Sequence, residues 1–187
     1  MNPHREFLNR EDCILLLVDI QKVMLDPCEG KDRLVKNAGG LIAAAELFKI
    51  PVIFSEHNSE KLGAFLPELT GKVSSPTILN KLEFSCFQNE GLARAMARTG
   101  RRTLLLAGLE THVCIFHTGA DALRLGYTVH VAVDAVASRS GLNREVGLRR
   151  LEQAGAVISS TEMMVYELLE RCGTEEFRAA LPLLKIL

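Results

Sequence analysis

Short, wholly apolar runs alternate with longer segments of helical pattern along almost the whole chain. The run from Cys13 to Val18 contains no polar side chain, which is typical of a strand buried on both faces of a sheet. Residues 32–49 follow, with apolar residues three and four positions apart, and this spacing predicts a helix with one apolar face. Strands that alternate with helices predict right-handed βαβ units and a parallel sheet covered on both sides.

The same patterns predict the remaining elements. Further strands are expected at 51–55, 77–80, 102–107, 127–133 and 156–159, and further helices at 89–98, 112–125, 143–154, 162–171 and from Glu175 onward. Pro182 is expected to interrupt the last helix, Thr161 to cap the one before it, and 56–76 to form a long loop. We therefore expect residues 1–187 to form a single α/β domain, a three-layer α/β/α sandwich with a mainly parallel, Rossmann-like sheet of about six strands.

The charge balance excludes some functions. The net charge of −1 offers no basic field for nucleic acid or for an anionic membrane, so neither is an expected partner. No apolar run approaches the roughly 18 residues that cross a bilayer, and the N-terminus lacks the apolar core of a secretory signal, so a cytoplasmic location is expected. The five cysteines are odd in number and none has Cys-x-x-Cys spacing, which argues against a disulfide framework and a zinc knuckle.

Reactive residues stand where the expected strands end. Asp19 closes the first strand, Lys81 closes the third and Cys114 follows the fourth. Ligands of such sheets bind beyond the carboxyl ends of the strands, where the strand order reverses. Together the three side chains supply a proton acceptor, a fixed cation and a nucleophile. Taken singly, each has a structural alternative: a turn or cap aspartate, a solvated lysine and a core cysteine.

Cys114 falls in the first turn of an expected helix, after the apolar run that ends at Gly108. Free N–H groups and the partial positive charge at a helix N-terminus lower the pKa of a thiol placed there. We therefore expect Cys114 to have a lowered pKa and to act as a thiolate nucleophile.

Other polar residues are weaker candidates. Gln21 is placed to orient Asp19 or a substrate, or to be a surface turn residue. His57 lies past the second strand without a second ligand at metal-site spacing, so we expect an isolated loop histidine and no metal. His112 and His117 flank Cys114, but their helical positions do not suit a Cys–His pair, and His117 is expected to pack. No Gly-x-Gly-x-x-Gly follows the first strand, so no dinucleotide cofactor, and no cofactor at all, is expected.

Three segments stand in a recognisable order: Leu-Leu-Leu-Val-Asp19-Ile-Gln21, Lys81-Leu-Glu-Phe-Ser85-Cys86-Phe87 and Ala-Gly108-Leu-Glu-Thr-His-Val-Cys114. Together, and at this approximate spacing, they resemble the isochorismatase-like, or cysteine hydrolase, superfamily. Its members include nicotinamidases, N-carbamoylsarcosine amidohydrolases and isochorismatases. The resemblance covers most of the chain, and the segment 133–139 also resembles one seen across the superfamily, where its role is expected to be structural.

The resemblance implies a catalytic triad of Asp19, Lys81 and Cys114. It also implies a cis peptide between Leu109 and Glu110, a bond that costs roughly 3–4 kcal/mol and persists only where its surroundings enforce it. That bond would aim the backbone N–H of Glu110 beside that of Cys114, and the two amides would form an oxyanion hole.

Departures from the superfamily narrow the expected activity. Nicotinamidases of the superfamily carry an Asp-x-His…His metal site after the second strand, and the corresponding Ser55-Glu56-His57-Asn58 lacks it. True isochorismatases lack the nucleophilic cysteine, so Cys114 counts against that activity. The segment 55–63 and the following Pro67-Glu68-Leu69 look closer to the small, poorly characterised isochorismatase-domain proteins.

The main hypothesis is a cysteine-dependent hydrolase that cleaves a C–N bond of a small amide or carbamoyl compound through a thioester. Two alternatives remain: isochorismatase-type ether hydrolysis with Asp19 as general acid, and a non-catalytic oligomeric binding protein. Gln21, Phe84 and Phe87 are the candidate substrate-binding residues, although phenylalanines are often plain core. Apolar residues such as Met163, Met164 and Leu169 exceed what one core face needs, and they either cover the last strand or form an interface. Members of the superfamily are commonly oligomeric, so the resemblance implies a homo-oligomer.

Overall fold

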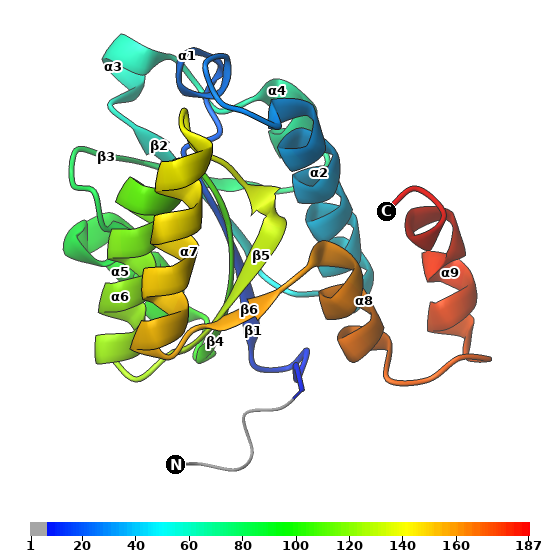
Figure 1. Ribbon diagram of the computed structural model, residues 1–187. Coiled ribbons are helices and arrows are strands. Elements are labelled where there is room, and N and C mark those ends of the chain that lie inside the picture. Colours follow the sequence, from blue (N-terminus) through cyan, green and yellow to red (C-terminus); the bar gives the residue numbers. More distant parts are fainter. Residues whose placement is uncertain (1–6) are drawn as a thin grey trace.

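The computed structural model describes residues 7–187 and contains a six-stranded, wholly parallel sheet (Figure 1). The order across the sheet is β3-β2-β1-β4-β5-β6. The strands are β1 (Cys13–Val18), β2 (Val52–His57), β3 (Thr77–Lys81), β4 (Thr103–Gly108), β5 (Thr128–Val136) and β6 (Val157–Ser159). The expected fold class is confirmed, because helices cover both faces of this sheet.

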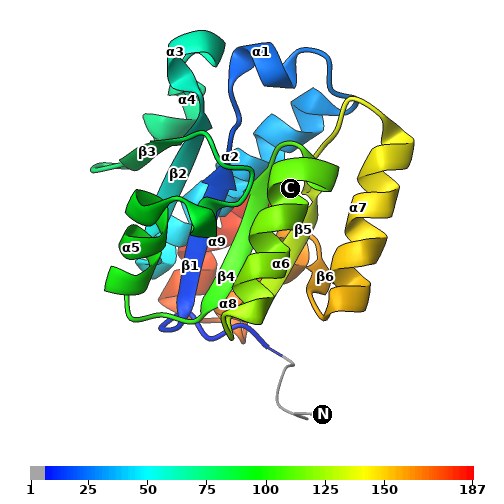
Figure 2. The same cartoon turned by 90° about the vertical axis from the view of Figure 1, so that its left-hand side faces the viewer.

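The helices form two layers. α5 (Glu90–Arg98), α6 (Phe116–Arg124) and α7 (Gly141–Ala154) lie on one face, and α2 (Lys31–Phe48), α8 (Thr161–Leu169) and α9 (Glu175–Leu184) lie on the other (Figures 1 and 2). Shorter turns are α1 (Lys22–Leu25), α3 (Ser59–Leu62), α4 (Pro67–Thr70), the 3-10 turn η1 (Cys86–Gln88) and the π-helical turn η2 (Thr111–Ile115). Among residues 7–187 no helix is long and apolar enough to cross a membrane.

The first strand shows why this sequence builds a two-faced core. All six residues of β1 are buried, as its uninterrupted apolar run predicts. Alternate side chains enter opposite layers: Leu15 and Leu17 join the core under α2 and α8, whereas Ile14 and Leu16 join the core under α5 and α6. Each such side chain contributes roughly 1.5–3 kcal/mol on burial, so this central strand alone anchors both layers.

The observed elements differ from the expected ones in three places. The stretch 56–76 is not one loop, because it contains the end of β2 and the short helices α3 and α4. α9 continues through Pro182, since Ala180 and Leu183 are buried and hold this part of the helix in place. Ser160 caps α8 by accepting from the Met163 amide, whereas the hydroxyl and amide of Thr161 both donate to Asp134.

The connectivity reverses the strand order at the centre of the sheet. The chain runs outward from β1 through β2 to β3 and then returns to the other side of β1 as β4. The strand order therefore reverses between β1 and β4, and Val18 lies level with Gly108 where these two strands end. Parallel sheets bind ligands beyond the carboxyl ends of their strands at such a reversal.

Candidate active site

Asp19, Lys81 and Cys114 meet at this reversal. Nζ of Lys81 lies 2.6 Å from Oδ2 of Asp19 and 3.5 Å from Sγ of Cys114. All three residues are buried, with no more than 2% of any of them exposed. The side chains come from the ends of β1 and β3 and from η2, so residues far apart in the sequence form one cluster. Their expected proximity is therefore observed.

The backbone of Asp19 is held in an uncommon conformation by its surroundings. Its φ of 54° is in the left-handed region, which non-glycine residues adopt mainly where the surroundings enforce it. Its backbone amide donates to the carbonyl of Ser55, and the Ser55 hydroxyl donates to Oδ1 over 2.7 Å. Sequence reasoning missed Ser55, although it stands in β2 level with Val18, the residue just before Asp19.

Lys81 is a buried cation with three close neighbours. Burial alone would lower its pKa, but the Asp19 carboxylate and the nearby thiols of Cys114 and Cys86 outweigh it, and the pKa is raised above the usual lysine value. Lys81 therefore stays protonated at neutral pH, as an ammonium whose hydrogens point at the acceptors around it.

The expectation of a lowered pKa at Cys114 is wrong. Burial raises the pKa of this thiol, the Asp19 carboxylate raises it further, and Lys81 offsets only part of the rise. The thiol is 2% exposed and belongs to a π-helical turn, a distortion that is frequent at functional sites. In the resting state the proton therefore sits on sulfur, and the neighbouring carboxylate is the group that can take it.

The turn between β4 and η2 depends on Gly108. Its φ is 126°, and a Cβ atom there would lie 2.0 Å from the carbonyl oxygen of Val18. This conformation lets the amide of Leu109 donate to that same carbonyl. The expected cis peptide between Leu109 and Glu110 is wrong, because all peptide bonds within residues 7–187 are trans.

The amides around Cys114 are mostly committed to other acceptors. Leu109 donates to Val18, Thr111 donates to Ala137, and the amides of Val113 and Ile115 both donate to the carbonyl of Glu110. The oxyanion pair expected at Glu110 and Cys114 was to be aimed by the cis bond, so with a trans bond here this pair stays a proposal.

The side chain of Glu110 fixes the turn from outside. Its carboxylate accepts from the backbone amide and from Nε of Arg139, at 2.9 and 3.1 Å. His112 supports the same junction, because its Nδ1 lies 3.1 Å from the hydroxyl of Ser138. The segment 133–139 therefore braces the turn that carries Cys114, in keeping with the structural role expected of it.

His57 was missed as a site residue. It ends β2 and is half-buried, and its Nδ1 lies 3.4 Å from Nζ of Lys81. Burial and the Lys81 charge lower its pKa below the usual histidine value. Sequence reasoning searched for a second ligand nearby in the sequence, whereas the partners of His57 come from other strands. A histidine placed level with Lys81 on neighbouring strand ends was the available signal.

The three candidate substrate-binding residues have different surroundings. Gln21 is fully buried, so the surface-turn alternative is wrong; both ends of its amide bond to the backbone of His57, and its nitrogen also bonds to Gly63. Phe87 packs against Tyr127, with ring centroids 5.1 Å apart, and is part of the core under α5 and α6. Neither is retained as a substrate contact.

Phe84 is the exposed member of the three candidate residues. It is 53% exposed, and its ring stacks on that of His57 with centroids 5.9 Å apart and 20° between planes. His117 is exposed, and its ring packs against two others, with centroids 5.9 Å from Phe84 and 5.6 Å from Phe116. Phe84 therefore bridges two imidazoles over the buried cluster.

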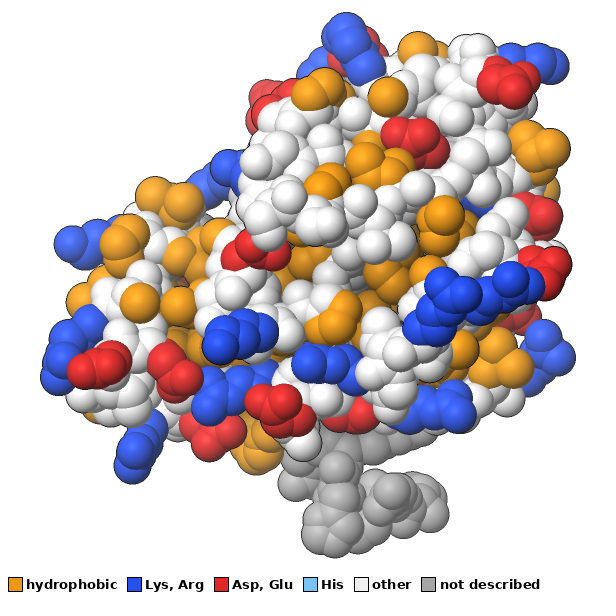
Figure 3. Space-filling model, turned by 180° about the vertical axis from the view of Figure 1, so that it is seen from behind, with side chains coloured by type: hydrophobic (Ala, Val, Ile, Leu, Met, Phe, Trp, Pro, Cys, Tyr) orange, Lys and Arg blue, Asp and Glu red, His pale blue; other side chains and the backbone are white. Residues whose placement is uncertain are grey.

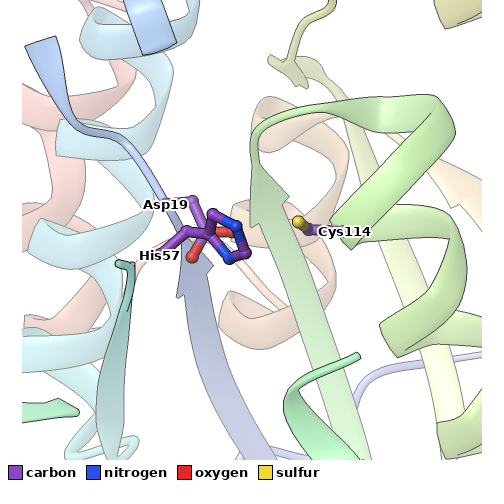
Figure 4. Close-up of side chains that lie close together, drawn as sticks. All are labelled: Asp19, His57 and Cys114. Atoms are coloured by element: carbon purple, nitrogen blue, oxygen red, sulfur yellow. The ribbon is translucent and has the colours of Figure 1, made fainter. Parts of the chain in front are cut away.

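Metal-ligating atoms also gather at this point. One ligand atom each from Asp19, His57 and Cys114 lies within 4.8 Å of the others, and Figure 4 shows the carboxylate and the imidazole facing the sulfur. By type these donors suit Zn²⁺. The ammonium of Lys81, however, contacts all three residues, so a metal ion would have to displace a buried, protonated lysine.

The Isochorismatase domain family matches residues 13–163, which is most of the chain, so this protein belongs to the isochorismatase family. The secreted isochorismatase effector Isc1 of Phytophthora sojae is 31% identical over 92% of this chain and 84% of its own. Mouse isochorismatase domain-containing protein 2B is 33% identical over 94% of this chain and 82% of its own.

Solved structures agree with this assignment. A protein described as MAR1 ribonuclease from Caenorhabditis elegans superposes with a TM-score of 0.90 at 28% identity, covering 96% of this chain and 93% of its own. YcaC from Pseudomonas aeruginosa, solved with covalent acrylamide, gives 0.88 at 27% identity over 95% and 91%. YcaC from Escherichia coli, described as an octameric hydrolase of unknown specificity, gives 0.86 at 26% identity over 91% and 85%.

Proposed function

We propose that this isochorismatase-family hydrolase cleaves a C–N bond in a small amide or carbamoyl compound through a thioester on Cys114. The observation that carries the proposal is the contact of one buried ammonium with both a carboxylate and a thiol, at 2.6 and 3.5 Å. The two groups around Lys81 are a base and a nucleophile. The covalent acrylamide on the P. aeruginosa neighbour supports a reactive group in proteins of this fold.

Acylation begins with the thiol proton. Asp19 takes this proton as the sulfur of Cys114 attacks the carbonyl carbon, so thiolate forms only when substrate is present. The resulting oxyanion accepts hydrogen bonds from the amides of Glu110 and Cys114. When the C–N bond breaks, the leaving nitrogen takes the proton from Asp19, and the acyl group stays on sulfur. Lys81 remains protonated and keeps the carboxylate oriented toward the reacting atoms.

Deacylation uses the same groups in reverse. Water attacks the thioester carbonyl and gives a proton to Asp19, and the amides of Glu110 and Cys114 again hold the oxyanion. The C–S bond then breaks, the sulfur recovers the proton from Asp19, and the carboxylic acid leaves. The carboxylate thus accepts and returns one proton in each half of the cycle.

The test is hydrolysis of small primary amides and carbamoyl compounds, followed as ammonia release. Wild-type protein is expected to turn over at least one of them. Cys114→Ala is expected to lower kcat by at least about a thousandfold, as for loss of a nucleophile that works with its base as a unit. The exposed Cys172 provides the control, and Cys172→Ser is expected to keep full activity. Full turnover by Cys114→Ala would exclude covalent catalysis.

Ether hydrolysis is the less favoured alternative. It needs Asp19 to begin the reaction as a proton donor. Both neighbours of that carboxylate, the Lys81 ammonium and the Ser55 hydroxyl, instead donate hydrogen bonds to it, which suits a proton acceptor. Cleavage of an enol ether that persists in Cys114→Ala would reverse this preference.

Phosphodiester cleavage is tested in parallel because one structural neighbour is described as a ribonuclease. The net charge of −1 provides no basic field for RNA, and the cation of Lys81 is already paired with Asp19. We therefore expect single-stranded RNA to stay intact with this protein. Cleavage that disappears in Asp19→Asn would establish the ribonuclease activity instead.

A homo-oligomer is also proposed. The E. coli neighbour is described as octameric, and hydrophobic side chains are exposed among charged ones, as the view from behind shows (Figure 3). Of the residues first considered, Met164 and Leu169 are buried in the monomer's own core and only Met163 is exposed. On α7, Leu142 and Val146 are 70% and 41% exposed one helical turn apart. Light scattering of wild type and Leu142→Glu/Val146→Glu tests whether a second copy covers this pair.

A further inference from the structure

The contacts of Lys81 determine which nitrogen of His57 carries a hydrogen. A protonated lysine has three hydrogens and no lone pair, so every polar group in contact with it must accept. Nζ of Lys81 lies 2.6 Å from Oδ2 of Asp19 and 3.4 Å from Nδ1 of His57. Nδ1 is therefore the nitrogen with the lone pair. In the neutral ring the hydrogen is then on Nε2, so the free edge of His57 is a donor.

The ring is also fixed in place. Gln21 binds both backbone atoms of His57: its Oε1 accepts from the His57 amide over 2.7 Å, and its Nε2 donates to the His57 carbonyl over 3.0 Å. The same amide donates to Gly63 over 2.6 Å, and the ring of Phe84 stacks on the imidazole. Gln21 thus holds the backbone of His57, and Lys81 determines which of its ring nitrogens is protonated. Phe84 restricts the plane of the imidazole ring.

The imidazole of His57 lies next to the place where the chemistry would happen. Ligand atoms of His57, Asp19 and Cys114 lie within 4.8 Å of one another, and Figure 4 shows the imidazole directed toward the sulfur. Burial and the charge of Lys81 lower the pKa of His57, against smaller opposing effects of Asp19 and Glu83. The ring is therefore neutral at pH 7 and offers a hydrogen bond without a charge.

We propose that His57 is a specificity-determining hydrogen-bond donor that binds an acceptor of the substrate other than the scissile carbonyl. This inference rests on the proposed amide hydrolysis and narrows its substrate class. The substrate would be a small amide with a second acceptor, such as another carbonyl or a ring nitrogen. An apolar group at that position would leave a buried N–H without a partner, which weakens binding.

Nuclear magnetic resonance tests the tautomer and the acceptor without any turnover. The protein is the full-length Cys114→Ser variant with ¹⁵N-labelled histidine, and His57→Gln in the same background assigns the signal. At pH 7 we expect Nδ1 of His57 to be unprotonated and Nε2 to carry hydrogen. Malonamide, which has a second carbonyl, is expected to shift the Nε2–H signal, whereas butyramide, of equal chain length, is not. A hydrogen on Nδ1, or equal responses to both amides, would overturn the proposal.

Two substitutions separate a donor from an acid–base group. The amide nitrogen of Gln reaches the position of Nε2, whereas that of Asn reaches only the position of Nδ1. With malonamide as substrate, His57→Gln is expected to keep kcat/KM within about threefold, and His57→Asn to lose roughly tenfold to a hundredfold through KM. The pH profile of kcat should not change. Equal losses in both variants, or a lost limb in the pH profile, would overturn a donor role.

The outcomes also distinguish this proposal from the one it rests on. If no amide is hydrolysed but malonamide still shifts the Nε2–H signal selectively, the donor role stands and amide hydrolysis fails. If malonamide and butyramide are hydrolysed equally well, amide hydrolysis stands and the specificity role of His57 fails.

Discussion

Nζ of Lys81 and Oδ2 of Asp19 form a buried ion pair of 2.6 Å, with neither side chain exposed to solvent. Breaking such a pair by removing one partner costs about 3–5 kcal/mol, because the remaining charge stays buried. Lys81→Met is therefore expected to lower the free energy of unfolding by that amount and to abolish activity. Denaturant unfolding measures the loss in free energy of unfolding. Lys72 is exposed, and Lys72→Met serves as the control.

Replacing both partners separates stability from catalysis. Asp19→Asn/Lys81→Met leaves no unpaired charge, so this double variant is expected to be more stable than Lys81→Met alone while staying inactive. A double variant no more stable than the single one would show that the loss comes from packing of the lysine chain instead of from the charge.

The reactivity of Cys114 should rise when Asp19 is neutralised. The carboxylate raises the pKa of this thiol and Lys81 lowers it, so Asp19→Asn removes one influence and leaves the other. In Asp19→Asn the pKa of the Cys114 thiol is expected to fall, and its alkylation by iodoacetamide at pH 7.5 is expected to be roughly tenfold faster. Turnover is expected to be lost. Glu83→Gln removes a nearby negative charge outside the cluster and should change alkylation little. Slower alkylation of Asp19→Asn would contradict this electrostatic account.

Gly108 is expected to tolerate no side chain. A Cβ there meets the Val18 carbonyl at 2.0 Å as well as an unfavourable φ, so Gly108→Ala should lose at least about 3 kcal/mol of stability and displace the turn that carries Cys114. Gly100 is the matched control, since it has a positive φ of 69° and nothing within 4 Å of the added atom. Gly100→Ala should lose only about 1 kcal/mol. Equal losses would mean that the contact with Val18 is unimportant.

His130 predicts how stability depends on pH. Burial lowers its pKa from 6.5 to about 4, and its Nδ1 has no hydrogen-bond partner among the described residues. The unfolded chain therefore binds a proton between these two values and the folded chain does not. The free energy of unfolding is therefore not reduced by His130 above pH 6.5, and it falls by about 3 kcal/mol as the pH drops to 4. His130→Phe should flatten the stability curve over this range; an unchanged slope would show that His130 does not titrate there.

Much of the fold follows from the apolar pattern. Each strand from β1 to β6 begins or ends within a few residues of its expected position, because uninterrupted apolar runs such as Cys13–Val18 are unambiguous in a parallel sheet. The proximity of Asp19, Lys81 and Cys114 also follows, since strand ends share one edge. Pro182 shows where prediction from the local sequence fails. The burial of residues on both sides of it outweighs the helix-breaking tendency of a single proline.

The electrostatics of the site does not follow from the pattern. Whether the pKa of Cys114 rises or falls depends on its burial and on its distance from the Asp19 carboxylate. Neither can be predicted from the residues next to Cys114 in the sequence. The same holds for Gln21, whose partners at 57 and 63 lie far along the chain. His57 was overlooked because its partner is a lysine, and metal-site spacing does not reveal such a contact.

The cellular location of the protein and its oligomeric state stay predictions. The expected cytoplasmic location has no structural counterpart, and one relative is named as a secreted effector. That residues 1–187 act as a single hydrolase domain is likewise a prediction. Expression of the tagged full-length chain with cell fractionation addresses location directly.

Intact-mass spectrometry of the acid-quenched protein during turnover of a small amide tests the covalent mechanism most directly. We predict a mass increase equal to the acyl part of that amide, located on Cys114 by peptide mapping and missing from Cys114→Ala. Turnover at the wild-type rate with no acyl group on Cys114, or an acyl group located on any other residue, would contradict it.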